Sequence, residues 1–228
     1  TLIDDVLGFY FNKAPSSAGD LNKDGIGDII ISARDKNASS NPTFAIVISG
    51  KDFEILHRFN IGELVYTTLS AGDINKDSYP DIMVAGVKAK FSIVKIFSGK
   101  EGNLLYSFGG KESYEQPSSY ITAGYDINKD GHDDFALSYQ SKTKIISGIN
   151  GQVLFELPKR TRATVNVEFI NDVNRDEFPD IAISDYAAHN DLNGQGIMSI
   201  YSGQNGELLH QILGGMNILQ LGLSIDSL

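Results

Sequence analysis

The chain has 228 residues, of which 41% are apolar, so it has the composition of a protein with a packed core rather than of a disordered chain. Its 19 basic and 29 acidic residues give a net charge of −10, which argues against nucleic acid and anionic membranes as partners and suits cations or neutral partners. It has no cysteine and no apolar run of about 18 residues, which excludes disulfides, thiolate zinc sites and a membrane-spanning helix.

An acidic turn follows the first predicted strand and recurs three times along the chain. Its first copy is GDLNKDGIGD at 19–28, and the later copies begin at Asp73, Asp126 and Asp172. Every copy has Asp at positions 1, 5 and 9 of the turn and Asn at position 3. Self-similarity at intervals of about 50 residues is the sequence signature of a repeat architecture.

Predicted strands surround each acidic turn in a fixed order. The turn is followed by a mostly β-branched or apolar run, then by a second run that ends in Ser-Gly, and then by a third run. The tight turn after Ser-Gly contains Glu101-Gly102, Asn150-Gly151 or Asn205-Gly206 in three of the four copies, and Asn-Gly favours tight hairpins. The first runs are 29–33, 82–86, 135–139 and 181–185, and the third runs are 54–59, 103–108, 152–157 and 207–212.

This order predicts an all-β fold, a β-propeller built of four-stranded antiparallel blades. The predicted repeats are roughly 8–61, 62–110, 111–158 and 159–214, and 215–228 begins a fifth, so about four blades plus one strand are expected. A β-sandwich with acidic turns is the alternative, although a sandwich need not repeat at a fixed period. No helical period is sustained, which argues against βαβ units, and the lack of Trp excludes WD repeats.

The acidic turns predict calcium sites. Three carboxylates, one amide oxygen and a backbone carbonyl at position 7 are hard oxygen ligands, which Ca²⁺ takes in numbers of about 6–8. The alternative is that Asp and Asn only form Asx-turns, but four copies of one pattern favour the metal. An EF-hand is excluded because its bidentate Glu at position 12 is replaced by apolar residues in predicted strands, namely Ile31, Val84, Leu137 and Ile183.

The block G-D-x-N-x-D-G-x-x-D, followed by D-[I/F]-x-[I/V/L]-[S/A], resembles the FG-GAP repeat of integrin-α-like β-propellers over almost the whole chain. That resemblance implies a loop between the first and second strands of a blade that binds Ca²⁺, up to four ions in all. The implied side-chain ligands are Asp20, Asn22, Asp24, Asp28, Asp73, Asn75, Asp77, Asp81, Asp126, Asn128, Asp130, Asp134, Asp172, Asn174, Asp176 and Asp180. The implied carbonyl ligands are those of Ile26, Tyr79, His132 and Phe178.

The chain departs from this family pattern at two places. Position 6 of the loop is Gly25 or Gly131 in two copies but Ser78 or Glu177 in the others, so better-formed sites are expected in the first and third blades. The Phe-Gly element is degraded, and its nearest remnants are Leu7-Gly8 and Leu221-Gly222.

The chain is expected to be a mature or trimmed piece of a longer propeller. It begins at Thr1 without a signal-peptide pattern, and integrin-like propellers have seven blades, about 350 residues at this period. An open fragment would self-associate or pair with the missing blades. Extracellular calcium modules bind with a Kd of about 10⁻⁴ to 10⁻³ M, which favours an extracellular, cell-surface or periplasmic location.

The expected function is a non-enzymatic binding or adhesion module for a protein or carbohydrate ligand, as the family resemblance implies. Ligand binding is assigned to loops on the side opposite the calcium loops. These ligand-binding loops run from Arg34 to Thr43, Gly109 to Tyr120 and Asp185 to Gly196. The alternatives are part of a secreted calcium-dependent polysaccharide lyase and a purely structural repeat. No catalytic motif is recognisable, and the four histidines are scattered. The candidate ligand-binding residues are Tyr186, His189, Asn190 and Asp191.

Overall fold

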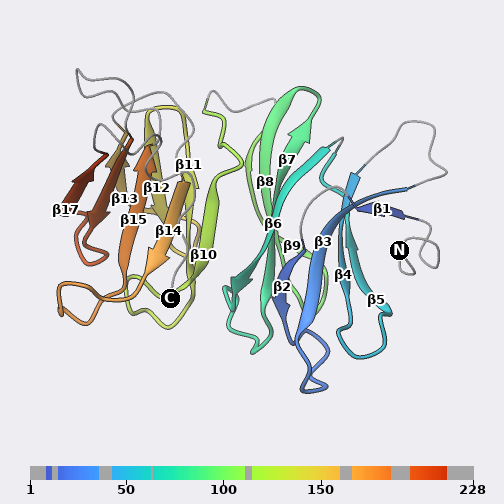
Figure 1. The fold of residues 1–228 in the computed structure, drawn as a ribbon. Coiled ribbons are helices and arrows are strands. Elements are labelled where there is room, and N and C mark those ends of the chain that lie inside the picture. The colour runs from blue at the N-terminus through green and yellow to red at the C-terminus, as the bar shows by residue number, and fades with distance from the viewer. Residues whose placement is uncertain are drawn as a thin grey trace. The chain divides into compact units, whose positions relative to one another are not determined.

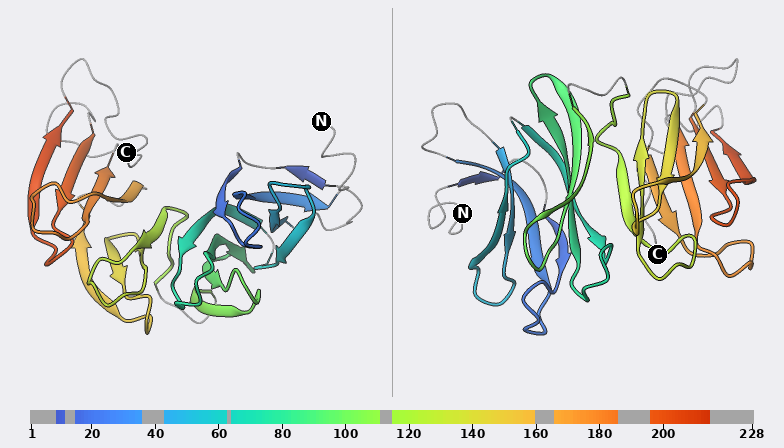
Figure 2. Two further views of the ribbon diagram at one scale, coloured as in Figure 1. Left: turned by 90° about the horizontal axis from the view of Figure 1, so that it is seen from below. Right: turned by 180° about the vertical axis from the view of Figure 1, so that it is seen from behind.

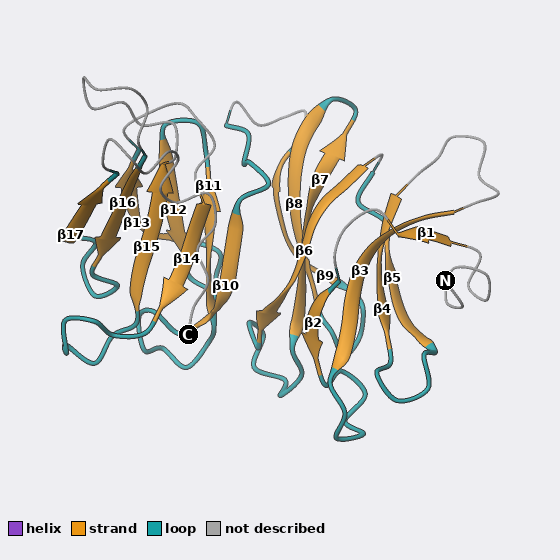
Figure 3. Ribbon diagram, in the orientation of Figure 1, coloured by secondary structure: helices purple, strands orange, loops and turns teal. Residues whose placement is uncertain are grey.

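The computed structural model describes residues 9–11, 15–35, 43–62, 64–110, 115–159, 166–185 and 196–214. Those residues form seventeen strands in four antiparallel sheets, and they contain no helix that is long and apolar enough to cross a membrane (Figure 3). The chain divides into two compact units, Thr1–Ser119 and Tyr120–Leu228, with two sheets in each (Figure 1). The all-β prediction and the four-stranded blade are therefore confirmed.

Each sheet is formed by strands that are consecutive in the sequence, as the alternation of apolar runs and turns predicts. In the first unit the strands are β1 (Phe9–Phe11), β2 (Ser16–Gly19), β3 (Asp28–Asp35), β4 (Thr43–Ile48) and β5 (Ile55–Phe59), then β6 (Leu64–Gly72), β7 (Asp81–Lys88), β8 (Phe91–Phe97) and β9 (Leu104–Gly109). In the second unit they are β10 (Ile121–Tyr125), β11 (Asp134–Ser138), β12 (Lys142–Ile146) and β13 (Val153–Pro158), then β14 (Asn166–Ile170), β15 (Asp180–Asp185), β16 (Ile197–Tyr201) and β17 (Leu208–Leu213).

The first blade has an interrupted first strand. Its second strand, β3, pairs along one half with β1 and along the other with β2, with Phe11 opposite Ala33 and Ser16 opposite Ile30. In the second blade the single strand β6 occupies the equivalent position along all of β7. We therefore treat β1 and β2 together as the first strand of an ordinary blade.

Within each unit, the two sheets lie next to each other (Figure 2). An apolar core forms where one blade packs on the next. The second strand of each blade is buried on both faces, which explains why these runs read as continuous apolar segments instead of alternating with polar residues. The core of the first unit includes Ile30, Val47 and Phe59 from its first blade, and Ile82, Val84 and Phe97 from its second. The core of the second unit includes Ala136, Ile145, Leu157, Ile181, Ile183 and Tyr201.

In three of the four blades, the glycine of the Ser-Gly pair lies against the acidic loop of its own blade. A Cβ atom built on Gly99 would lie 1.8 Å from the carbonyl oxygen of Pro80, and one on Gly203 would lie 1.8 Å from that of Pro179. Gly50 approaches the carbonyl of Gly27 in the same way, at 2.1 Å. The recurrent Ser-Gly therefore reflects a backbone contact that no side chain permits.

We predict that Gly99→Ala destabilises the chain strongly, because its methyl group would overlap a backbone carbonyl that cannot rotate away. A loss of more than about 3 kcal/mol is expected in urea unfolding followed by circular dichroism. The matched control is Gly25→Ala, which meets no atom within 4 Å and is strained only by its φ of +85°. Equal losses in the two variants would contradict the steric explanation.

The tight turn after each Ser-Gly pair has a left-handed residue at the third position after the pair. In three blades this residue is glycine, with φ of 72° at Gly102, 70° at Gly151 and 75° at Gly206. In the first blade it is Phe53, with φ of 65°, whose side chain is 51% exposed. In all four blades this residue donates its N–H to the carbonyl of the serine in the Ser-Gly pair. The turn of the first blade therefore has the same hydrogen bond as the others, although Phe53 is in a conformation that is unfavourable for a non-glycine residue.

We predict that Phe53→Gly stabilises the chain by about 0.5–1 kcal/mol. Relief of left-handed strain, about 1–2 kcal/mol, outweighs the greater freedom of glycine in the unfolded state. The measurement is the urea midpoint at constant m-value. Gly102→Phe in the second blade is the reciprocal control and is expected to destabilise, because a Cβ atom there would lie 3.2 Å from His57. A stability decrease in Phe53→Gly would contradict the assignment of strain.

Three predictions fall outside the described residues. The fifth repeat was expected at 215–228, and the two remnants of the Phe-Gly element at Leu7-Gly8 and Leu221-Gly222.

Candidate metal centres

The four acidic loops share one backbone conformation. Position 4 is left-handed in every copy, with φ of 59° at Lys23, 59° at Lys76, 60° at Lys129 and 67° at Arg175. Position 6 is left-handed as well, with φ of 85° at Gly25, 70° at Ser78, 87° at Gly131 and 71° at Glu177. Ser78 and Glu177 therefore adopt a conformation that glycine adopts with less strain, which is the physical basis for expecting better-formed sites in the first and third blades.

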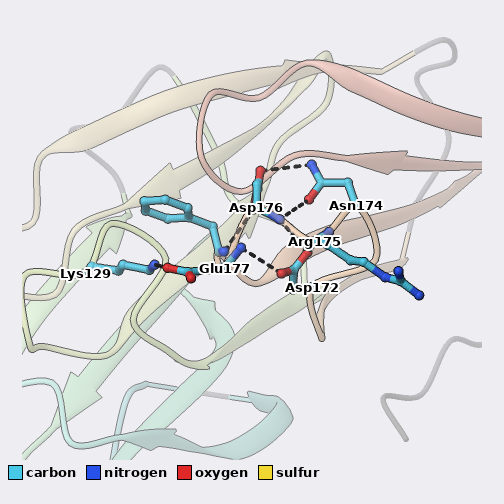
Figure 4. Close-up of polar contacts among 7 residues, drawn as sticks. Lys129, Asp172, Asn174, Arg175, Asp176 and Glu177 are labelled. Carbon is cyan, nitrogen blue, oxygen red and sulfur yellow. Dashed lines mark hydrogen bonds and ion pairs between the residues drawn. The ribbon is translucent and has the colours of Figure 1, made fainter.

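The acidic side chains fold inward over the backbone of their own loop, as the fourth loop illustrates (Figure 4). Asp172 accepts the N–H of Asp176 at 3.2 Å through Oδ1 and the N–H of Glu177 at 2.7 Å through Oδ2. Asn174 Oδ1 accepts the N–H of Asp176 at 3.0 Å, and Asp176 Oδ1 accepts the N–H of Phe178 at 2.9 Å. The side chains at positions 1, 3 and 5 of the loop are thereby held on the inner side of one turn.

The other three loops repeat these contacts. The position-1 carboxylate accepts the N–H groups of positions 5 and 6 in each, at 3.1 and 2.9 Å in the first loop, 2.9 and 2.8 Å in the second, and 3.0 and 2.7 Å in the third. The position-3 amide nitrogen donates to the position-5 carboxylate at 2.8–3.1 Å. The Asp and Asn side chains therefore do form Asx-turns in all four loops. The same hydrogen bonds also hold the carboxylates of each loop close together.

The aspartate at position 9 has a different role, because it is buried and joins two turns. Asp81 Oδ2 accepts the N–H groups of Ile74 at 2.9 Å and Asn75 at 3.2 Å, while Oδ1 accepts that of Gly99 at 3.2 Å. Asp28, Asp134 and Asp180 make the equivalent bonds to position 2 of their loop, at 2.7–2.9 Å, and to the glycine of the Ser-Gly pair, at 2.9–3.2 Å. The acidic loop and the hairpin are thereby fastened to each other in every blade.

In the second and third blades, burial makes this aspartate costly to ionise. Removal from water raises the pKa of Asp81 to about 7 and that of Asp134 to about 6, although backbone N–H groups act in the opposite direction. The neighbouring carboxylates of Asp77 and Asp130 add to the increase. A cation held in the loop would favour the charged form of all these groups.

The donor set of each loop fits a hard cation. Asp, Asn and carbonyl oxygens are the ligands that calcium takes, and a carboxylate oxygen that accepts one backbone N–H retains a second lone pair. Among the described residues, however, no three His, Asp or Glu side chains converge in a ready-made metal-binding arrangement. The residues that would hold the ion are those at positions 1, 3, 5 and 9, with the carbonyl at position 7.

Consecutive loops contact each other through a cation and an aromatic ring, which sequence reasoning missed. Lys129 Nζ lies 4.1 Å from the centre of the Phe178 ring and 3.6 Å from Glu177 Oε2. In the first unit Lys23 Nζ lies 4.8 Å from the centre of the Tyr79 ring. The signal was present, because position 4 is always basic and position 7 is aromatic in the second and fourth loops.

The loops expected to bind ligand are mostly outside the described residues. This applies to Tyr186, His189, Asn190 and Asp191. Of the other histidines, His57 lies between blades, with Nε2 2.6 Å from the carbonyl oxygen of Gly99, and its ring stacks on Phe59. His210 is exposed on β17, and His132 lies in the third acidic loop.

Solved structures similar to this chain are β-propeller proteins. BBS1N in complex with ARL6DN matches with a TM-score of 0.55 and 11% identity, over 90% of this chain and 58% of that one. The rhamnogalacturonan lyase of Bacillus licheniformis matches with a TM-score of 0.52 and 13% identity, over 90% and 51%. The exotype rhamnogalacturonan lyase YesX matches with a TM-score of 0.53 and 13% identity, over 90% and 49%.

These similarities establish the propeller fold, and the chain spans roughly half of the length of each of those proteins. No family model and no curated protein sequence matches the chain.

We predict that Asp81→Ala destabilises the chain by at least about 3 kcal/mol, because two buried N–H groups and one partly buried N–H group would lose their acceptor. Chemical unfolding measures this loss. The control is Glu101→Ala in the exposed hairpin of the same blade, which is expected to change stability by less than about 0.5 kcal/mol. A small loss in Asp81→Ala would show that the buried carboxylate does not hold the loop and hairpin together.

Proposed function

We propose that the chain is a calcium-stabilised propeller region of the FG-GAP type that binds a protein or carbohydrate outside the cytosol. The observation that carries the proposal is the repetition of one loop conformation with one donor set in four blades. A single acidic turn has ordinary structural explanations. Four loops that adopt strained left-handed conformations at the same two positions indicate a shared function for this loop shape. Binding of one Ca²⁺ ion in each loop would be that function.

The proposed role of the metal is structural. Each ion would neutralise carboxylates that lie within one short turn and would stabilise the edge of a blade. Ligand recognition is then assigned to the opposite ends of the strands, where the loops from Arg34 to Thr43, Gly109 to Tyr120 and Asp185 to Gly196 connect them. Those loops can vary in sequence because the calcium loops and Ser-Gly hairpins hold the blades independently of them.

Comparisons support binding as the function class. BBS1N is in complex with a protein, ARL6DN, and two other similar structures are rhamnogalacturonan lyases. A propeller of this type is therefore compatible with a protein ligand or with a carbohydrate ligand. We favour a non-enzymatic module, because the sequence contains no recognisable catalytic motif.

The second candidate function is part of a calcium-dependent polysaccharide lyase, which the two lyase structures favour. A lyase acting by β-elimination on a uronate leaves an unsaturated product that absorbs ultraviolet light. Incubation with rhamnogalacturonan and other polyuronates in millimolar Ca²⁺ distinguishes the candidates. Rising absorbance that is lost in His189→Ala would favour the lyase, and retention on immobilised glycan or protein without turnover would favour the binding module.

We predict that millimolar Ca²⁺ raises the thermal midpoint by many degrees relative to excess EDTA, whereas Mg²⁺ has little effect. One site occupied at 100 times its Kd adds about 2.7 kcal/mol, and four sites act together. Differential scanning calorimetry measures the shift, and isothermal titration measures the number of sites. Asp20→Ala/Asp24→Ala is expected to remove one site and leave three.

Ser78→Gly provides a matched test of site quality, because it introduces at position 6 the residue found in the first and third loops. Tighter calcium binding at the second site is expected. A thermal midpoint that is the same in Ca²⁺ and EDTA would refute calcium binding and leave the loops as Asx-turns alone.

A further inference from the structure

The hairpin that joins β7 to β8 carries lysines at the end of the second blade that lies away from the acidic loops (Figure 1). β7 begins at Asp81 in the second acidic loop and ends at Lys88, and β8 begins at Phe91, so Ala89 and Lys90 form the turn. Lys88 and Lys90 are both exposed. This hairpin is therefore a local basic surface on a chain whose net charge is −10.

A third lysine lies on the same face of the second blade as Lys88. In the register of the sheet, Lys88 is opposite Phe91, and Lys95 is opposite both Val84 on β7 and Ser107 on β9. Side chains two residues apart on a strand share a face, so Lys88, Phe91, Lys95 and Ser107 all lie on the face of Val84. Ser107 is exposed, and Phe91 and Lys95 are partly exposed. Two ammonium groups, an aromatic ring and a hydroxyl group are thereby presented together.

These lysines lack a compensating charge within the described part of the chain. None of Lys88, Lys90 and Lys95 forms an ion pair with a described carboxylate. Burial lowers the pKa of Lys95, and the positive charge of Lys88 acts in the same direction, with no described carboxylate opposing them. Like charges held close together disfavour the folded chain, and a bound anion would remove that cost.

The third blade shows how lysines of the corresponding strand are compensated. Lys144 on β12 is equivalent to Lys95 on β8 in the strand register. Lys144 Nζ lies 4.7 Å from the centre of the Tyr139 ring, and Lys142 Nζ lies 2.8 Å from Glu156 Oε1. Among the described residues of the second blade, neither kind of contact is found at Lys95. The uncompensated charge is therefore particular to the second blade and is not a property of the repeat.

The turn of this hairpin is strained as well. Ala89 has a φ of 51° and Lys90 a φ of 73°, so both central residues of the turn are left-handed. Asn-Gly is favoured in two-residue turns of this shape, because glycine adopts the left-handed conformation without steric cost. A lysine at the second position lowers stability relative to glycine, and strain of this kind is retained at functional sites.

We propose that the β7–β8 hairpin binds an acidic glycan through its carboxylate or sulfate groups. Lys88, Lys90 and Lys95 supply ammonium groups that neutralise anionic groups along the glycan. The ring of Phe91 suits the C–H face of a sugar, and the hydroxyl group of Ser107 suits sugar hydroxyl groups. A ring and a hydroxyl group beside the charges favour a glycan over an acidic peptide. The inference rests on the proposed function, because it names the ligand class of that binding module.

The test uses the full chain in millimolar Ca²⁺ with four fluorescently labelled probes. Short oligogalacturonates are the carboxylated probe, dextran sulfate the sulfated probe, dextran the neutral probe and poly-glutamate the acidic peptide probe. Fluorescence anisotropy at increasing NaCl is expected to show binding of at least one acidic glycan that weakens as salt rises, and no binding of dextran. The tighter of the two acidic glycans identifies the anionic group.

Three results of this titration would overturn the proposal. The first is that neither acidic glycan binds. The second is that dextran binds as tightly as the acidic glycans, which would remove the role of charge. The third is that poly-glutamate binds as tightly as either acidic glycan, which would remove the assignment to a sugar.

The decisive variant is Lys90→Gly, because it removes a charge and also relieves the left-handed strain. We expect a thermal midpoint equal to or above that of the unaltered chain and about threefold weaker binding of the acidic glycan. Lys88→Gln/Lys95→Gln removes the repulsion between two lysines and is expected to weaken binding about tenfold without lowering the thermal midpoint. The matched control is Lys142→Gln in the third blade, which is expected to leave affinity unchanged.

The outcomes separate this inference from the proposed function. If acidic glycans bind with unchanged affinity in every hairpin variant, the hairpin is not the site, although the chain remains a carbohydrate-binding module. If the chain binds a protein ligand and no acidic glycan, the hairpin inference fails and the binding module stands. Weaker binding in the hairpin variants but not in Lys142→Gln supports the hairpin as the site, even where Ca²⁺ leaves the thermal midpoint unchanged.

Discussion

The structure of every blade depends on the hydrogen bonds of the buried aspartate at the end of its acidic loop. One of its oxygens accepts a backbone N–H at the start of the loop, and the other accepts the N–H of the glycine in the Ser-Gly pair. In three blades that glycine, which is Gly50, Gly99 or Gly203, lies against the backbone carbonyl that precedes the aspartate. The turn between the first and second strands and the turn between the third and fourth are therefore one structural unit, which explains why their sequence motifs recur together.

Electrostatics links this unit to the proposed calcium. In the second and third loops, Asp81 and Asp134 are removed from water and lie close to another carboxylate of the same loop, which raises the pKa of each and disfavours its charged form in the absence of a cation. The loop nevertheless keeps the carboxylates, and it adopts left-handed conformations at positions 4 and 6 in all four copies. Backbone hydrogen bonds explain the shape of the loop, and a divalent cation would explain the concentration of negative charge in it.

Comparison of the two units shows where the repeat is free to diverge. The cation–aromatic contact between consecutive loops occurs in both units, as Lys23 with Tyr79 and Lys129 with Phe178. The residues at the opposite end of the interface differ, with Ile61 beside Gly86 in one unit and with Lys159 and Asp185 at the equivalent positions of the other. A repeat that is held at its loop end can accept polar residues at its other end, which is where we infer recognition.

Periodicity alone was sufficient to predict the all-β class, the four strands of each blade and the order of their turns, because these depend on local alternation, turn residues and a recurring spacing. It also predicted that the acidic side chains gather in one turn, since they lie within nine residues of each other. The double fastening by Asp81 and its equivalents and the packing of Gly99 on Pro80 were not predictable in this way. They join residues that are far apart in the sequence, and only the packing of strands and blades brings those residues into contact.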